Sequence, residues 1–179
     1  MPPSPPRIDE FAVKLIFMTV TQSRLARSAP ALLLGLTLLL AGCGSSSLSR
    51  EEEDARSSAF LAAASAKQGA ITTPTGLVYR ELEAGTGPMP TASNKVRVHY
   101  RGTLVDGTEF DSSLDGEPLE FPLDGVIPCW TEGVQMMRTG GKAELVCPAE
   151  IAYGDRGAGS DIPPGAALVF EVQLLDIVQ

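Results

Sequence analysis

The side chains that most often carry covalent or metal chemistry are scarce in this chain of 179 residues. It contains one histidine, His99, and three cysteines, Cys43, Cys129 and Cys147. One histidine excludes a metal site built from several histidines, and any Ser-His-Asp triad would have to use His99. Three cysteines are too few for a small fold held together mainly by disulfides. The counts therefore argue against a metalloenzyme or a hydrolase that needs a histidine base.

The charge balance of the chain is acidic. There are 22 Asp and Glu residues against 14 Lys and Arg residues, which gives a formal net charge of −8. A protein that binds nucleic acid is expected to carry a basic patch. The sequence therefore predicts that nucleic acid is not a partner.

The front of the chain has the pattern of an export signal. Residues 31–41 are almost wholly apolar and follow Arg24 and Arg27, which is typical of a secretory leader and too short for a membrane span. The run ends in Leu-Ala-Gly-Cys, which resembles the lipobox of bacterial lipoproteins. The resemblance implies a signal peptide over residues 1–42 and lipidation of Cys43. The alternative is an ordinary signal peptide followed by a free cysteine.

Two further expectations concern this leader. Met18 begins a more usual leader than Met1, so we expect translation to start at Met18. Gly44 follows the predicted lipid-bearing cysteine, where lipoproteins retained at the inner membrane tend to carry Asp. We therefore expect a lipid-anchored protein of the bacterial cell envelope that faces the periplasm from the outer membrane.

A short tether follows the leader. Ser49 and Glu52 have the spacing of a capping box, which predicts a helix over residues 50–67. Its apolar face is small, so it is either a solvated spacer or a dimerising helix. The turn-rich stretch 72–76 predicts a boundary. We therefore assign residues 43–73 to the lipidated cysteine, linker and helix, and residues 74–179 to one domain.

The domain has the pattern of strands around one helix. In residues 95–101 the apolar side chains alternate with polar ones, which places Tyr100 inward and His99 outward. Asp-Gly at 106–107 predicts a hairpin of strands 96–104 and 108–112. Further strands are predicted at 77–82, 143–147 and 167–177, and a helix at 127–137. The pattern predicts an α+β fold in which an antiparallel sheet wraps a short helix.

Six segments of this domain resemble the FKBP family of peptidyl-prolyl cis-trans isomerases. They are Val98–Gly102, Asp106–Ser113, Val126–Gly133, Ala152–Gly154, Ile162–Pro164 and Leu168–Val172. The lead-in 69–79 is similar to the macrophage infectivity potentiator subgroup of exported bacterial members. The resemblance implies a half-barrel of five or six antiparallel strands around the helix. That subgroup usually has a longer dimerising helical domain, so we expect a monomer or weak dimer.

The resemblance also implies a site. Its catalytic residues would be Tyr100, Asp111, Trp130 and Tyr153, and its substrate-binding residues Phe110, Leu119, Val126, Ile127, Ile162 and Phe170. Trp130 would form the floor under the prolyl ring, while the Tyr153 hydroxyl and the Ile127 N–H would bind peptide carbonyls. Asp111 would either act near the carbonyl before proline or only hold the pocket geometry. Leu119 and Ala158 replace bulkier residues of some members, which affects sequence preference or macrolide affinity.

The implied reaction explains the scarcity of reactive side chains. Rotation about an X-Pro bond is slow because the twisted amide loses resonance, yet no bond is broken. We therefore expect neither cofactor nor metal, and partners that are proline-containing unfolded or exported polypeptides, with macrolide inhibitors as possible ligands of the pocket. The alternative function is a chaperone that uses the pocket without turnover.

The family fold also implies the fate of two cysteines. It brings positions 129 and 147 close together, and an exported compartment permits disulfides. The resemblance therefore implies a Cys129–Cys147 disulfide. The alternative is two small buried thiols.

Overall fold

The computed structural model describes residues 45–178, with side chains from residue 50 onward. The predicted signal peptide 1–42, the start at Met18 and the lipidated Cys43 lie outside the described residues. The described residues belong to one compact unit, Gly42–Gln179. No helix among them is long and apolar enough to cross a membrane.

The domain is built on one antiparallel sheet of seven strands, in the order β1-β2-β6-β7-β3-β4, with β5 also paired to β3. The strands are β1 (Ala70–Thr72), β2 (Val78–Glu83), β3 (Lys95–Leu104), β4 (Glu109–Ser112), β5 (Leu119–Pro122), β6 (Lys142–Cys147) and β7 (Leu168–Val178). The predicted fold class is confirmed, but five or six strands is an undercount. The strands missed are β1 and β5, which are too short for side-chain alternation to reveal. The sheet begins at Ala70, four residues before the boundary expected at residue 74.

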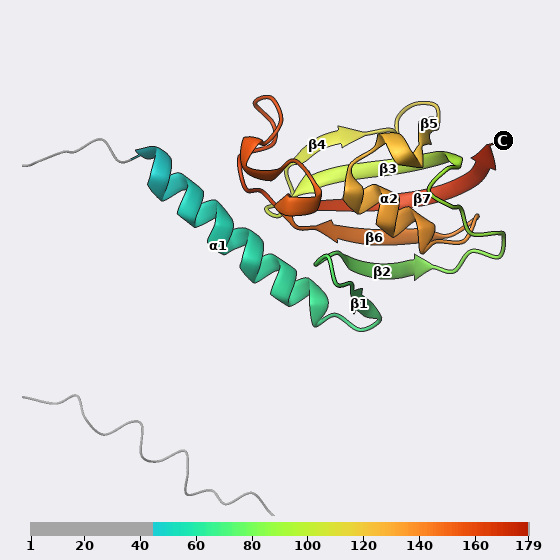
Figure 1. The fold of residues 1–179 in the computed structure, drawn as a ribbon, viewed down its shortest axis with the longest axis horizontal. Helices are drawn as coiled ribbons and strands as arrows, with labels where there is room; N and C mark the ends of the chain where they lie inside the picture. Colours follow the sequence, from blue (N-terminus) through green and yellow to red (C-terminus); the bar gives the residue numbers. More distant parts are fainter. Residues whose placement is uncertain (1–44, 179) are drawn as a thin grey trace, which may run out of the picture. The chain divides into compact units, whose positions relative to one another are not determined.

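The helix α2 (Pro128–Gln135) crosses one face of this sheet (Figure 1). Proline suits the first helical turn because its missing N–H would have no helical partner there. Trp130 and Val134 are buried against the sheet. Three short 3-10 helices complete the connections: η1 (Leu123–Gly125), η2 (Ala149–Ile151) and η3 (Gly154–Arg156).

The main core lies between α2 and the concave face of the sheet. The predicted alternation of β3 is confirmed, since Val96, Val98 and Tyr100 are buried. Every second residue of β7 joins them in the same core: Leu168, Phe170, Val172 and Leu174. These two long strands pair directly, so they form the rigid centre of the sheet on which a site can be held.

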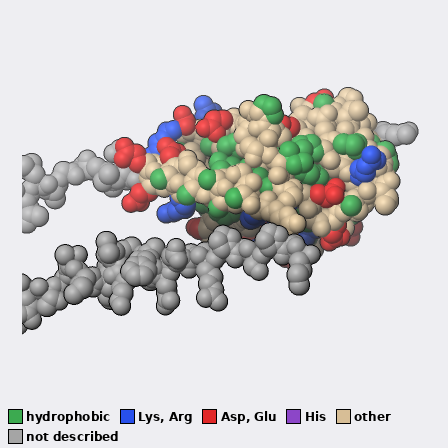
Figure 2. Space-filling model, turned by 90° about the horizontal axis from the view of Figure 1, so that it is seen from below, with side chains coloured by type: hydrophobic (Ala, Val, Ile, Leu, Met, Phe, Trp, Pro, Cys, Tyr) green, Lys and Arg blue, Asp and Glu red, His purple; other side chains and the backbone are tan. Residues whose placement is uncertain are grey.

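The helix α1 (Ser45–Ser65) begins earlier than predicted. Ser49 lies inside the helix, so the expectation that it caps the first turn is wrong. Serine is a weak helix former but not a helix breaker, so the serine run 45–47 can extend the helix. Figure 2 shows Lys, Arg, Asp and Glu side chains gathered at the α1 end of one face of the molecule.

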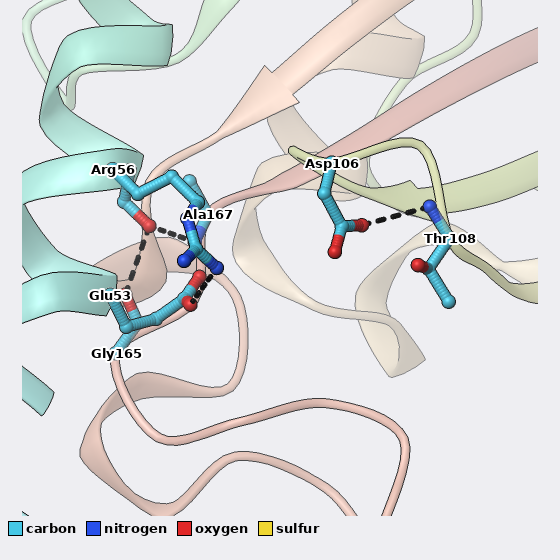
Figure 3. A network of polar contacts seen from close by, with 7 residues as sticks. Glu53, Arg56, Asp106, Thr108, Gly165 and Ala167 are labelled. Carbon is cyan, nitrogen blue, oxygen red and sulfur yellow. Dashed lines mark hydrogen bonds and ion pairs between the residues drawn. The ribbon is translucent and has the colours of Figure 1, made fainter. Parts of the chain in front are cut away.

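The helix α1 is docked on the domain rather than solvated on all sides. Ala64 forms a small second core with Val78 and Val146, and Phe60 and Leu61 pack against it. Nearer its N-terminus, α1 contacts the segment that leads into β7 (Figure 3). The expectation of a solvated spacer helix is therefore wrong, because the few apolar residues of α1 pack on Val78 of β2 and Val146 of β6.

Candidate active site

A cavity of about 300 Å³ opens between α2 and the concave face of the sheet. Side chains from β3, β4, β5, α2 and β7 converge on it, together with the connection between η1 and α2 and the residue before η3. The lining residues are Tyr100, Phe110, Asp111, Phe121, Gly125, Val126, Ile127, Trp130, Tyr153 and Phe170. Most of these are apolar or aromatic, which suits a small apolar group with a few directed polar contacts.

Trp130 is the centre of an aromatic cluster. Its ring stands edge-to-face against Tyr100 at 5.1 Å, Phe170 at 5.4 Å and Phe121 at 5.7 Å between ring centroids. The indole Nε1 is buried and has no hydrogen-bond partner among the described residues. Aromatic faces accept an N–H only weakly, so the cluster leaves this donor nearly unsatisfied. Such packing fixes the Trp130 ring in one orientation.

The wall on the β4 side depends on a glycine. Phe110 and Phe170 stand edge-to-face with centroids 5.6 Å apart, and Gly102 lies beneath them. A Cβ at Gly102 would come within 2.7 Å of the Phe110 ring and 3.0 Å of the Phe170 ring. Glycine at this position therefore allows the edges of both rings to come close to the β3 backbone.

The polar contact at the cavity joins Tyr100 to Asp111. The Tyr100 hydroxyl donates a hydrogen bond of 2.5 Å to Oδ2 of Asp111. Burial, and then the bond to Asp111, raise the pKa of the Tyr100 phenol well above its usual value of 10. Tyr100 therefore stays a neutral donor over the physiological range, and the Asp111 carboxylate is held in a fixed direction.

Two groups at the cavity rim are available to a ligand. Tyr153 keeps 39% of its surface exposed. Ile127 precedes α2 in an extended conformation, and its carbonyl accepts bonds from Trp130 and Thr131. Its own N–H takes no part in the backbone hydrogen bonds of the described residues. The rim can therefore offer one hydroxyl and one N–H to an incoming carbonyl.

The cavity contains eight of the ten residues expected at the site. Ile162 is buried in the main core, and Leu119, the first residue of β5, is 41% exposed; neither lines the cavity. Phe121 and Gly125 line it although they were not expected to. Phe121 shares the strand face of Leu119 but lies further along β5, where α2 covers it. Strand alternation could have identified it as a second candidate.

The start of α2 is tied to the sheet below the cavity. Cys129 and Cys147 are joined in a disulfide, with Cα atoms 5.8 Å apart and both side chains fully buried. Cys129 directly precedes Trp130. The link therefore fixes the position of the cavity floor relative to β6.

The architecture recurs in a solved structure. A crystal structure named as a peptidyl-prolyl cis-trans isomerase from Pseudomonas syringae pv. tomato matches with 43% identity and a TM-score of 0.68, over 72% of this chain and 96% of that one. Residues 87–175 also match the profile of the FKBP-type peptidyl-prolyl cis-trans isomerases. This chain belongs to the FKBP-type isomerase family.

Curated relatives agree with this membership. The FKBP-type 22 kDa peptidyl-prolyl cis-trans isomerase of Escherichia coli is 53% identical over 63% of this chain and 55% of its own length. The outer membrane protein MIP of Legionella longbeachae is 44% identical over 71% of this chain and 55% of its own length. This FKBP-family chain thus spans about half the length of these relatives.

Proposed function

We propose that the protein is a peptidyl-prolyl cis-trans isomerase that accelerates X-Pro rotation in exported polypeptides. The observation that carries the proposal is the aromatic cavity floored by Trp130, with the Tyr100–Asp111 hydrogen bond at its side. Its volume of about 300 Å³ suits a prolyl ring and part of its neighbours. Family membership supports the same activity.

The cavity favours rotation without any reactive group. The barrier of about 18–20 kcal/mol is the lost resonance of the amide. A twisted amide carries less charge on its carbonyl oxygen than a planar one, so an apolar site that excludes water penalises the planar state more. Binding that is stronger in the twisted state than in the ground state lowers the barrier.

The polar groups have separate roles in this proposal. Tyr153 and the N–H of Ile127 bind carbonyls on either side of the prolyl ring and hold the peptide in place. Asp111, fixed by Tyr100, faces the carbonyl before proline. A carboxylate there disfavours the charged oxygen of the planar amide and so adds to the effect of the apolar walls.

The test is isomerisation of a short X-Pro peptide by the full chain. We expect Trp130→Ala to lower kcat/KM by about a hundredfold. We expect Tyr153→Phe to lower it by about three- to tenfold, because this variant loses one hydrogen bond to the peptide. Tyr79→Phe is the matched control, because Tyr79 is on β2 outside the cavity lining. Circular dichroism of each variant verifies that it is folded.

Two results would overturn the isomerase proposal. One is a wild-type rate equal to the uncatalysed rate. The other is a rate that Trp130→Ala leaves unchanged. Peptide binding without turnover would favour the alternative, a chaperone that uses the same cavity.

We place the protein in the cell envelope, anchored through lipid on Cys43 and facing the periplasm from the outer membrane. The leader pattern over residues 1–42 supports this location, as does the name of the Legionella relative. Incorporation of labelled palmitate into the wild type, but not into Cys43→Ser, is the expected result. Equal labelling of both, or of neither, would exclude the anchor.

A further inference from the structure

A second groove adjoins the cavity. It has a volume of about 480 Å³ and runs along the outer face of α2, bounded by η1 and the loop at Ala92. Val126 lines both the cavity and this groove. If the prolyl residue of a peptide occupies the cavity, a residue close to it in the peptide sequence can therefore pass over Val126 and reach the groove.

The groove combines an apolar floor with negative charge. Val126 and Pro128 supply apolar surface, while Asp124 and Glu132 supply carboxylates, and no Lys or Arg lines it. Neither carboxylate forms an ion pair within the part of the chain that the structure describes. The groove therefore has uncompensated negative charge beside a surface suited to an aliphatic chain.

The walls of the groove are held in place. Thr75 donates a hydrogen bond of 2.5 Å to Oε2 of Glu132, which orients that carboxylate and leaves its other oxygen available. The Leu123 carbonyl accepts the Thr131 hydroxyl at 2.5 Å, which ties η1 to α2. The loop at Ala92 is tied to η1 because the Asn94 carbonyl accepts the N–H of Leu123. The groove is thus built before any ligand arrives.

We propose that this groove binds a Lys or Arg side chain of the substrate close to the isomerised proline. A long basic side chain can lay its methylene stem on Val126 and Pro128 and place its charge beside Asp124 and Glu132. The proposal rests on the proposed isomerase function and names the substrate class of that site: prolyl segments with a basic residue close to the proline.

The test compares peptides that differ in one residue. Lys, Gln or Glu is placed in turn at each position flanking the proline, and binding to the full chain is followed through the fluorescence of Trp130, the single tryptophan. At low ionic strength we expect that, for at least one flanking position, the peptide with Lys binds about three- to tenfold more tightly than the peptide with Glu. This preference should shrink as salt screens the charges. The same peptides are also assayed for turnover.

The variants separate the groove from the overall charge. Asp124→Asn with Glu132→Gln should abolish the preference for Lys and leave the Gln peptide unaffected. Glu81→Gln with Glu83→Gln removes the same charge from β2, outside the groove, and should retain the preference.

The outcomes distinguish the two proposals. The groove proposal would be overturned if the Lys and Glu peptides bound equally at every position. It would also be overturned if the preference for Lys persisted in the Asp124→Asn, Glu132→Gln variant. A preference lost equally in the control pair would also overturn it. Because fluorescence does not require turnover, an absent isomerase rate would overturn the function alone.

Discussion

Ser57 and Ala167 are joined by a hydrogen bond across 110 residues of sequence, with the backbone N–H of Ala167 donating to the Ser57 hydroxyl at 2.9 Å. Ser57 donates in turn to the Gly165 carbonyl at 3.4 Å. The N–H of Gly165 donates to the carbonyl of Gly154, the residue after Tyr153. The helix α1 is therefore connected to the rim of the cavity through the Ser57 hydroxyl and the backbone of Gly165 and Gly154.

Ser57→Ala is expected to destabilise the protein by about 1–3 kcal/mol, because it leaves the buried N–H of Ala167 without a partner. Ser58→Ala is the matched control, since Ser58 is exposed on the same turn of α1 and should change stability by less than about 0.5 kcal/mol. Urea unfolding of both variants provides the measurement. Equal stabilities would show that α1 does not hold the segment 165–167.

Gly102→Ala should disturb the cavity directly, because its Cβ would collide with the rings of Phe110 and Phe170. We expect a loss of about 1–3 kcal/mol in stability and a lower kcat/KM for an X-Pro peptide. Gly116→Ala has open space around the new Cβ and an ordinary backbone conformation, so it should be nearly neutral. A fully active and stable Gly102→Ala would contradict the described position of these rings.

The raised tyrosine pKa values predict an alkaline limit to stability. Burial raises the pKa of Tyr79 and of Tyr100 above the value of 10 that they have in the unfolded chain. Above about pH 10 the unfolded chain loses these protons first, so the stabilisation is complete below that pH and is lost as pH rises beyond it. Urea unfolding at pH values from about 9 to about 12 is the measurement. The free energy of unfolding should fall less over this range for Tyr100→Phe than for the wild type.

Glu144 predicts the opposite limit in acid. Burial disfavours its charge, but hydrogen bonds from Arg80 and Lys67 outweigh burial and lower its pKa below 4.5. The stabilisation is therefore complete above about pH 4.5 and is lost as pH falls through the lower, folded value. Glu144→Gln should cost about 1 kcal/mol near pH 7, and this cost should shrink as pH falls below about 4.5. Glu150→Gln is the control, because Glu150 is exposed and forms no ion pair with the residues that the structure describes. A cost of Glu144→Gln that does not depend on pH would contradict the ion-pair explanation.

Reduction of the Cys129–Cys147 link is expected to lower the free energy of unfolding by on the order of 3 kcal/mol, because the unfolded chain then gains freedom over a loop of 18 residues. The double variant Cys129→Ala with Cys147→Ala should lose a similar amount and no longer respond to reductant. Mass spectrometry with and without reductant counts the thiols. Free thiols at both positions in the oxidised protein would disprove the link.

The alternation of apolar residues was enough to predict β3 and β7, because buried residues alternate with more exposed ones along most of each strand. It could not predict β1, which has three residues and pairs only with β2. The docking of α1 was missed for a related reason. Its contacts include a few apolar residues, among them Phe60 and Leu61, and an ion pair of Arg50 with Asp155. They also include Ser57, whose partners are backbone groups that have no sequence signature.

Most of the expected site residues line one cavity, because the family motifs that suggested them specify the distance in sequence between these residues. They placed Tyr100, Trp130 and Phe170 in one cavity from three separate elements. They did not predict that Ile162 would turn into the core, because its side-chain direction depends on the loop between η3 and β7. The adjoining groove could not be predicted at all, since it depends on how η1 and the loop at Ala92 pack beside α2.

The position of β7 constrains when the protein can fold. This strand lies in the middle of the sheet, between β6 and β3, although it is the last strand in the sequence. Strands β3 and β6 therefore have no central partner until β7 has been synthesised, and sheet formation must wait for contacts between sequence-distant segments, which form slowly. A chain of this topology therefore cannot complete its central sheet until its last strand has been synthesised.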